Sequence, residues 1–398
     1  MRYAAILDRL NALGAAKWDI YYRAQALEAA GHDIIDLTIG NPDVPAPEPL
    51  IEAAVTALRA GRTEYSDGRG EPALRAALAR RYSDSTGREI TPAQILCFPG
   101  TQTALYAVMT GLAEPGTEVL VGDPMYATYE GVIRASGAEP VPVPLRPERG
   151  FRLSAEDLAA RVTPRTRALL LNSPQNPTGA VLRAEDIAAI GEIARAHDLW
   201  IVADEVYDEL IFSGAPFASP LADPALAERT VVVSSISKSH AAPGFRSGWA
   251  VLPEEAAARL APLSDTMLFG NQPFIADATA LAVSAPSATA RGMAARLSAR
   301  AQRLAERLEA GPLKVNRPEA GMFALIDIRA TGMSDAAYAA DLLEKTGVAL
   351  MPGSVFGPSI AGWVRLALTV PDAKLDEAIT RILTHAERHM RAPSRAEA

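Results

Sequence analysis

The chain has 398 residues, of which 49% are hydrophobic and 22% are charged, and its formal net charge is −8 at pH 7. This length predicts two lobes, and the acidic balance disfavours nucleic acid as a partner, because phosphate binding needs a basic surface. No apolar run could span a bilayer, and residues 1–30 lack the apolar stretch of a signal peptide. The single cysteine, Cys97, excludes an intrachain disulfide, and we expect a buried, inert thiol in a cytoplasmic protein.

The first ninety residues predict three helices and one strand. The helices are expected at 11–30, 48–60 and 71–85, and the strand at 34–39. Gly31 is a usual residue to end the first helix. Tyr65 lies in a polar, glycine-rich loop between the second and third helices.

Residues 94–252 repeat a pattern of a short apolar strand followed by a helix. The strands are expected at 94–98, 118–121, 140–143, 168–171, 199–203, 230–234 and 249–252. Near-continuous Val, Ile and Leu runs indicate a sheet covered by helices on both faces. Alternation of strand and helix predicts mostly parallel strands, and ligands of such sheets bind beyond the carboxyl ends of the strands.

The last part of the chain predicts a linking helix and a smaller α+β unit. A helix over 287–310 should connect the lobes, followed by strand, strand, helix, strand, strand and helix, which we expect to pack with the N-terminal segment. The tail after Arg391 is polar and expected to fray. The predicted domains are a large one over 46–285 and a small one formed by 1–45 and 286–398.

The five histidines give no support for a metal site. Only His385 and His389 have a spacing that places two of them on one helix face, and no carboxylate completes an H-E-x-x-H pattern. We expect both to be solvated side chains of the C-terminal helix, and no metal.

Lysine is rare in this chain. Of 39 basic residues, five are lysine and the other 34 are arginine. Lys238 ends a run of small and hydroxylated residues after a valine-rich strand, and Arg246 follows eight residues later. A lysine enclosed beside a cation has a lowered pKa and can form a Schiff base near neutral pH, while hydroxyls and an arginine can bind a phosphate. The alternative is a loop with a chance lysine.

Two further segments place polar groups after strands. Asn176 lies in a rigid loop with two X-Pro steps, which could position a ligand or form only a tight turn. Asp204 and Glu205 end an apolar strand, where a carboxylate is costly unless a cation meets it. A protonated pyridine nitrogen would serve, with Tyr207 able to reach an oxygen of the same ring. An ordinary ion pair is the alternative.

Three more positions fit the same ligand. The sequence from Gly100 opens a helix whose free N–H groups could bind phosphate, although capping alone would also explain Thr101. Tyr126 follows another strand and could stack on a planar ring or belong to the core. Arg365 lies in a β-patterned run, where it could hold a substrate carboxylate or pair with an internal acid. Together the motifs indicate a phosphorylated, planar, cationic heterocycle.

The motifs Ser-Ile-Ser-Lys, Gly-Phe-Arg-Ser-Gly-Trp, Asn-Pro-Thr-Gly and Asp-Glu-Val-Tyr resemble those of the class I/II aminotransferases, which depend on pyridoxal 5′-phosphate. The resemblance covers residues 17–385. It implies the α/β architecture of fold type I, with a mostly parallel central sheet between helices and a smaller α+β domain. It also implies a homodimer with active sites at the subunit interface. Val44 departs from the family, which often has an aromatic residue there, and Thr101 replaces the second glycine of the phosphate loop.

The resemblance assigns a role to each candidate residue. Lys238 would attach the cofactor and move the substrate proton, and Asp204 would keep the pyridine nitrogen protonated. Tyr207 and Asn176 would bond the ring oxygen, and Tyr126 would stack on the ring. The phosphate would be surrounded by Gly100, Thr101, Gln102, Ser235, Ser237 and Arg246, and by Tyr65 of the neighbouring subunit. Arg365, with the backbone near Gly40, would bind the substrate α-carboxylate.

Within the family, segments such as 18–24 and 321–323 resemble the arginine–pyruvate transaminases. The expected reaction moves an amino group from an L-amino acid to a 2-oxo acid in a ping-pong cycle. By this resemblance, the amino acid is arginine and the 2-oxo acid is pyruvate. Trp18, Asp19 and Tyr22 are candidates to receive the guanidinium. The alternatives are an aspartate- or aromatic-type transaminase and a carbon–sulfur β-lyase. A transaminase-like regulator is disfavoured, because such a protein carries an attached DNA-binding domain and the family pattern here starts by residue 17, which leaves no room for one.

Overall fold

The computed structural model describes residues 2–11, 13, 15–212 and 214–391. In this part of the chain, all seven predicted strands between residues 94 and 252 form one seven-stranded sheet, in the order β2-β8-β7-β6-β5-β3-β4. They are β2 (Ile95–Phe98), β3 (Glu118–Asp123), β4 (Glu139–Pro144), β5 (Thr166–Asn172), β6 (Trp200–Asp204), β7 (Thr230–Ser235) and β8 (Gly248–Val251). Strands β4, β3, β5, β6 and β7 are parallel, whereas β8 and β2 each run antiparallel to their neighbour.

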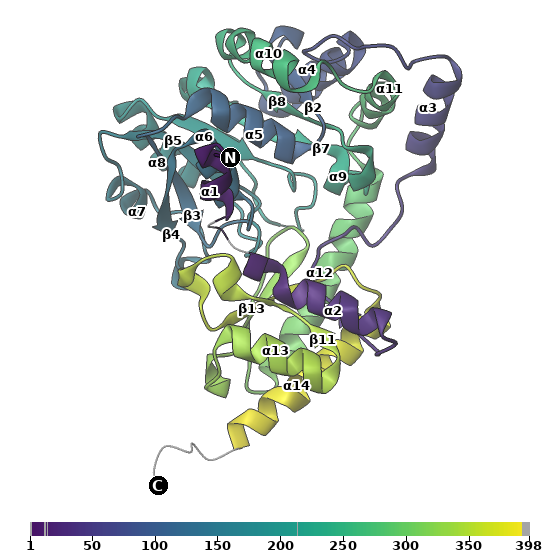
Figure 1. Ribbon diagram of the computed structural model, residues 1–398, viewed down its shortest axis with the longest axis vertical. Helices are drawn as coiled ribbons and strands as arrows, with labels where there is room; N and C mark the ends of the chain where they lie inside the picture. Colours follow the sequence, from purple (N-terminus) through teal and green to yellow (C-terminus); the bar gives the residue numbers. More distant parts are fainter. Residues whose placement is uncertain (1, 12, 14, 213, 392–398) are drawn as a thin grey trace.

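Helices cover both faces of this sheet, as Figure 1 shows. They are α3 (Glu48–Arg59), α4 (Pro72–Thr86), α5 (Thr101–Leu112), α6 (Tyr129–Ser136), α7 (Ala155–Ala159), α8 (Ala184–Ala196), α9 (Ile236–Ser239), α10 (Glu254–Leu268) and α11 (Pro273–Ala282). Successive strand residues enter different cores: Val231 and Val233 join the core with α5 and α10, and Val232 joins the core with α4 and α8. This explains the continuous apolar runs.

Figure 1 also shows α12 (Ala288–Glu309) running from the large sheet toward a second, smaller group of elements. This group contains β9 (Lys314–Asn316), β10 (Phe323–Asp327), α13 (Asp335–Thr346), β11 (Val348–Ala349), β12 (Met351–Pro352), β13 (Trp363–Ala367) and α14 (Asp372–Arg391). The predicted count of two strands before the last helix is wrong. The run at 348–352 is split, because β11 pairs with the N-terminal strand β1 (Ile35–Asp36) and β12 pairs with β13.

The N-terminal segment departs from the predicted single helix over 11–30. The structure has α1 (Ala5–Asn11), a short 3-10 turn at Ala15–Trp18 and α2 (Asp19–Ala29). Helix α1 fully buries none of its side chains. It lies against α6, whereas α2 lies against α13 and β11. The predicted domain boundaries stay a prediction.

Three expectations about single residues and segments have clear outcomes. Cys97 is buried, as expected, and burial raises the pKa of its thiol to about 12. The prediction of two solvated histidines is wrong for His385, which is buried because α13 covers it with the ring of Tyr338. No helix in the described ranges is long and apolar enough to cross a membrane. The tail predicted to fray after Arg391 lies outside those ranges.

Candidate active site

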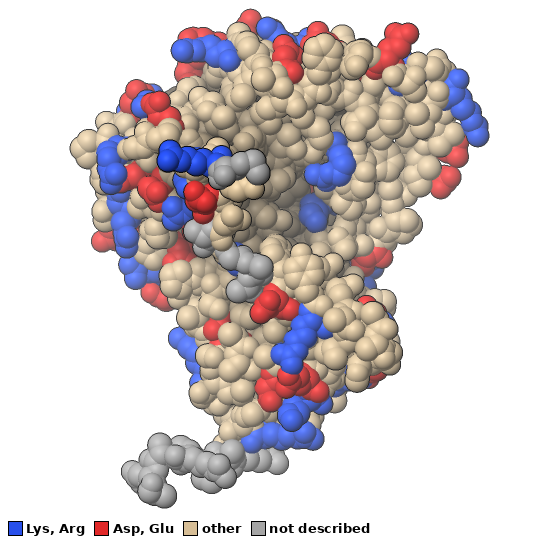
Figure 2. All heavy atoms as spheres, viewed as in Figure 1, with Lys and Arg blue, Asp and Glu red and all other residues tan. Residues whose placement is uncertain are grey.

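A cavity of about 220 Å³ lies at the carboxyl ends of β5, β6 and β7, beside the start of α5. Figure 2 shows the corresponding face of the molecule hollowed, with Lys or Arg atoms in the wall of the hollow. Twelve of the predicted site residues line the cavity: Gly40, Thr101, Gln102, Tyr126, Asn176, Asp204, Tyr207, Ser235, Ser237, Lys238, Arg246 and Arg365. Gly100 immediately precedes α5, and only Tyr65 lies elsewhere, with 85% of its surface exposed.

Lys238 reaches into the cavity from the short helix α9, which follows β7 directly. Its Nζ donates a hydrogen bond to the carbonyl oxygen of Gly40 at 3.0 Å, and no acid pairs with it among the described residues. Burial, with help from the positive charges of Arg365 and Arg246, lowers the pKa of this amine to about 8. About a fifth of this amine is therefore in the neutral, nucleophilic form at about pH 7.4, far more than for an ordinary lysine.

Asp204 ends β6 with its carboxylate buried in the cavity wall. Oδ2 accepts a hydrogen bond from the hydroxyl of Tyr129 at 2.7 Å, and Oδ1 accepts one from the backbone N–H of Val206 at 3.2 Å. Burial raises the pKa of Asp204 to about 6. The ion pair considered as an alternative for this residue is absent among the described residues, so a buried acid faces the cavity without a protein cation.

The loop that contains Asn176 is held by its own hydrogen bonds. Its backbone N–H donates to the side chain of Asn172 at 2.8 Å, which itself donates to the carbonyl of Asp204 at 3.1 Å. This ties the loop after β5 to the end of β6. Asn176 and Tyr207 both line the cavity, and each is buried.

Arg365 is buried in the cavity wall on β13 and has no carboxylate partner among the described residues. Its guanidinium lies between the rings of Phe323 and Phe356, 4.0 and 4.4 Å from their centroids. It donates to the side-chain oxygen of Asn176 at 3.2 Å and to the carbonyl oxygen of Thr38. Its Nε is buried with no partner, and burial lowers the pKa of Arg365 to about 10. The internal ion pair considered from the sequence is therefore not formed, and the guanidinium can accept an external carboxylate.

The start of α5 and the end of β7 form a second polar region of the cavity. Gly100 has φ +87°, and a Cβ there would lie 2.3 Å from Nη2 of Arg246, so glycine lets this guanidinium approach the helix start. Thr101 does not cap the helix, and its Oγ1 is buried without a partner in the described structure. Ser235 and Ser237 add hydroxyls from the α9 side. This region offers the donors that a phosphate needs.

Tyr126 and Gln102 complete the predicted set. Tyr126 lines the cavity, and its ring meets that of Tyr129 edge to face, with centroids 5.5 Å apart. Gln102 accepts a hydrogen bond from the hydroxyl of Thr128 at 3.0 Å. Tyr129, which holds the carboxylate of Asp204, was not found from the sequence, because nothing in its local pattern indicates a contact 75 residues away.

Of the three N-terminal residues considered for binding the substrate guanidinium, only Trp18 lines the cavity. Asp19 and Tyr22 lie on the exposed side of α2. Next to Trp18, Lys17 forms an ion pair with Glu130 of α6 at 2.9 Å. The residues just before α2 therefore contact α6, beside the seven-stranded sheet, whereas α2 itself packs on the smaller unit.

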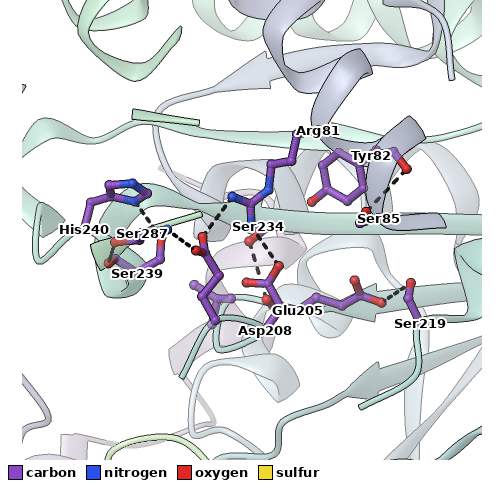
Figure 3. Close-up of polar contacts among 12 residues, drawn as sticks. Arg81, Tyr82, Ser85, Glu205, Asp208, Ser219, Ser234, Ser239, His240 and Ser287 are labelled. Carbon is purple, nitrogen blue, oxygen red and sulfur yellow. Dashed lines mark hydrogen bonds and ion pairs between the residues drawn. The ribbon is translucent and has the colours of Figure 1, made fainter. Parts of the chain in front are cut away.

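Behind the cavity, the residues that follow Asp204 form a separate buried network (Figure 3). Glu205 accepts a hydrogen bond from Ser219 at 2.6 Å. Arg81 of α4 pairs with Asp208 at 3.0 Å and with Glu209 at 2.8 Å. Burial raises the pKa of Asp208 to about 6 and that of Glu205 well above its usual range.

The same network reaches the linking helix α12. Glu209 accepts from the backbone N–H of Ser287 at 2.6 Å, and the Ser287 hydroxyl donates to the carbonyl oxygen of Ser239 at 2.6 Å while accepting from Ala290. Ser239 in turn lies next to Lys238 and contacts His240 at 2.9 Å. The start of α12 is thus bonded to the residue that follows the reactive lysine.

Comparison with known proteins places this site in a family. Residues 32–382 match the family described as aminotransferase class I and II. The chain is 45% identical over 383 residues to arginine–pyruvate transaminase of Pseudomonas aeruginosa, covering 96% of this chain and 97% of that protein. Among solved structures it is similar to aspartate aminotransferase of Thermus thermophilus, with a TM-score of 0.90, 33% identity and coverage of 97% and 100% of the two chains. The aromatic aminotransferase of Pyrococcus horikoshii gives 0.89 and 30%, with coverage of 96% and 99%.

Proposed function

Because the chain belongs to the class I and II aminotransferases, we propose that it uses pyridoxal 5′-phosphate to move an amino group from L-arginine to pyruvate in a ping-pong cycle. One observation carries the proposal for the chemistry. An amine with a pKa of about 8 at Lys238 and a buried acid at Asp204 line the same cavity as the unpaired guanidinium of Arg365.

The residues of the cavity fit this cofactor. Pyridoxal phosphate, when bound, supplies an aldehyde that condenses with amines and a ring that takes up electrons released at the substrate Cα. Lys238 is the attachment point, and Asp204 can hold a proton on the ring nitrogen. Arg246 and the unpartnered hydroxyl of Thr101 would hold the phosphate at the start of α5.

The same geometry gives each protein group its part in the reaction. Arg365 binds the α-carboxylate of the substrate and fixes its orientation relative to the ring. Nζ of Lys238 would accept the proton from the substrate Cα and later give it up again, so this one amine would act as both base and acid. Trp18 and Tyr126 narrow the cavity and reduce the access of water.

Arginine as the amino donor is supported by the 45% identity to the arginine–pyruvate transaminase and by the charges of the cavity. The cavity-lining cations in the described chain are Lys238, Arg246 and Arg365. They are assigned above to the cofactor, its phosphate and the α-carboxylate of the substrate, so no further cation of the same chain is left for a distal carboxylate. The indole of Trp18 offers a flat surface on which a substrate guanidinium can stack. These features favour arginine over the aspartate-type alternative.

A single-turnover absorbance screen tests the proposal. The holoenzyme is mixed with each amino acid in turn without an acceptor, and the absorption band of the bound cofactor is followed. We expect arginine to bleach the band most rapidly and pyruvate to restore it. Faster bleaching by aspartate or an aromatic amino acid would show that this amino acid, and not arginine, is the preferred amino donor. Release of pyruvate from cystathionine without an acceptor would favour the β-lyase alternative.

We propose further that the protein acts as a homodimer in which Tyr65 reaches the phosphate in the neighbouring subunit. Tyr65 is 85% exposed and meets the ring of Phe269, itself 69% exposed, edge to face at 5.1 Å. Two large exposed rings side by side are typical of a surface that another chain covers. Light scattering should give twice the chain mass, and Tyr65→Phe should weaken cofactor binding without changing that mass. A monomer with unchanged activity on dilution would contradict the proposal.

A further inference from the structure

A second cluster of reactive side chains lies in the small unit. Asp341 of α13 and the residues His385 and His389 of α14 place their ligand atoms within 4.8 Å of one another. Among the His, Cys, Asp and Glu side chains of the described ranges, these three converge closely enough to hold a metal ion. None of the three lines the active-site cavity, so the cluster is separate from the proposed reaction.

The geometry of the cluster is that of ligands sharing one central point. Nε2 of His385 lies 2.8 Å from Oδ2 of Asp341, and Nε2 of His389 lies 3.2 Å from the same oxygen. Tetrahedral zinc bonds of roughly 2.0–2.2 Å place neighbouring ligand atoms about 3.3 Å apart. A small widening of the cluster would therefore admit an ion in place of the shared hydrogen bonds.

The positions of the three side chains also favour a metal ion. The two histidines are one helical turn apart on α14, and His385 is held by the edge-to-face ring of Tyr338 at 4.9 Å. His389 and Asp341 are each about 30% exposed at the side chain, so the site is open to solvent on one side and a water could fill the fourth position.

From this convergence we propose that Asp341, His385 and His389 bind one divalent transition-metal ion of the zinc type. Two imidazoles and one carboxylate suit zinc, nickel or copper, whereas magnesium and calcium prefer oxygen ligands alone. The ion links α13 to α14 and stabilises the small unit. Nδ1 of His385 is buried without a partner in the described structure, and the lack of such a partner costs roughly 10- to 100-fold in metal affinity. We therefore expect weaker binding than at a site whose histidines are both held by such a partner.

The sequence alone could not reveal this site, because Asp341 precedes His385 by 44 residues and lies on another helix. Only the packing of α13 on α14 brings the carboxylate to the histidine pair. The competing explanation is a clamp of two histidines hydrogen-bonded to one acid, which would stabilise the helices with no ion. Loss of stability on mutation does not separate the two, so the test must depend on the metal.

The experiment titrates zinc sulfate into the untagged, chelator-treated holoenzyme by calorimetry, with magnesium chloride as the control ion. We expect one zinc per chain, no magnesium binding, and an upward shift of Tm with zinc. His389→Ala and Asp341→Asn, which change partly exposed positions, should weaken zinc binding by about 100-fold or more and abolish the Tm shift. His197→Ala, an exposed histidine outside the cluster, should bind like the wild type. Equal zinc binding by wild type and His389→Ala, or none by either, would overturn the proposal.

Discussion

Consecutive residues at the end of β6, and likewise in the short helix α9 that follows β7, face two different regions of the protein. Asp204 and Lys238 enter the cavity, where neither has a charged protein partner among the described residues. Their direct neighbours Glu205 and Ser239 enter the network behind it, where Ser219 and Ser287 satisfy them. Each of these two segments therefore presents one group that is available to a ligand and one that is already hydrogen-bonded within the protein. The predictions below break or sharpen this contrast.

The largest effect should come from Lys238→Ala. Loss of the amine removes the proposed attachment point of the cofactor and the proposed proton carrier. Removal of a positioned proton-transfer group alone costs about 10²- to 10⁴-fold. We expect amino transfer to fall by at least the upper value in steady-state assays. Ser239→Ala, on the other side, keeps the backbone carbonyl that Ser287 bonds and should stay within about threefold of the wild type. Near-wild-type turnover by the lysine variant would contradict the proposed role.

Arg81→Met should be the most destabilising of these changes. It leaves Asp208 and Glu209 without their cation in a buried site, which typically costs about 3–5 kcal/mol. The exposed pair of Arg146 with Asp157 is the control, since Arg146→Met should cost about 1 kcal/mol or less. Urea unfolding measures both.

The pH dependence of the Arg81→Met effect follows from the pKa of Asp208. That pKa is raised to about 6, so the folded state holds the proton more strongly than the unfolded one. Arg81 holds this pKa down in the wild type, so in the variant Asp208 takes up its proton above pH 6, which removes the unpaired charge. The destabilisation should therefore shrink as the pH falls toward 6 and level off below it. A cost that is equal at pH 5 and pH 8 would show that charge is not its cause.

Two adjacent acids allow a matched test within one strand end. Asp204→Asn removes the group proposed to hold the ring proton and should lower kcat by about 10²- to 10³-fold, as loss of one oriented electrostatic group does. Glu205→Gln should leave kcat within about threefold, because this acid is held by Ser219 away from the cavity. Equal losses from the two variants would remove the distinction between the two sides.

The smallest effect concerns the pH at which the cofactor attaches. The neutral amine is the attacking form, and a pKa lowered to about 8 means that this form accumulates as the pH rises through 8. The rate of cofactor uptake by the apoprotein should therefore increase up to about pH 8 and level off above it. A rise that continued toward pH 10.4, the usual value for lysine, would show an unshifted amine.

Much of this arrangement could be predicted from the sequence. Runs rich in Val, Ile and Leu predicted the strands, and their alternation with helices predicted the α/β class. The solved relatives confirm that class. Residues such as Lys238, Asp204 and Arg365 were found because each is costly to bury without a ligand. Asp204 and Lys238 meet because β6 and β7 are neighbouring parallel strands, whereas Arg365 reaches the same cavity from β13 of the smaller, antiparallel sheet.

Other features depend on contacts between distant segments and could not be predicted. Tyr129 bonds Asp204 across 75 residues, and Phe356 covers Arg365 from a loop with no recognisable pattern. The burial of His385 depends on α13 packing over it. The predicted roles of the individual site residues, and the domain boundaries, remain predictions that the variants above test.

The scarcity of lysine has a consequence for the protein's reactivity toward labels. An ordinary lysine, with a pKa near 10.4, is less than about 1% neutral at pH 8. Lys238, with its pKa of about 8, is roughly half neutral there and lies in a cavity open to small molecules. In the apoprotein, a small amine-directed reagent therefore meets only four other lysine side chains. Limited labelling at pH 8 should mark Lys238 before these four lysines.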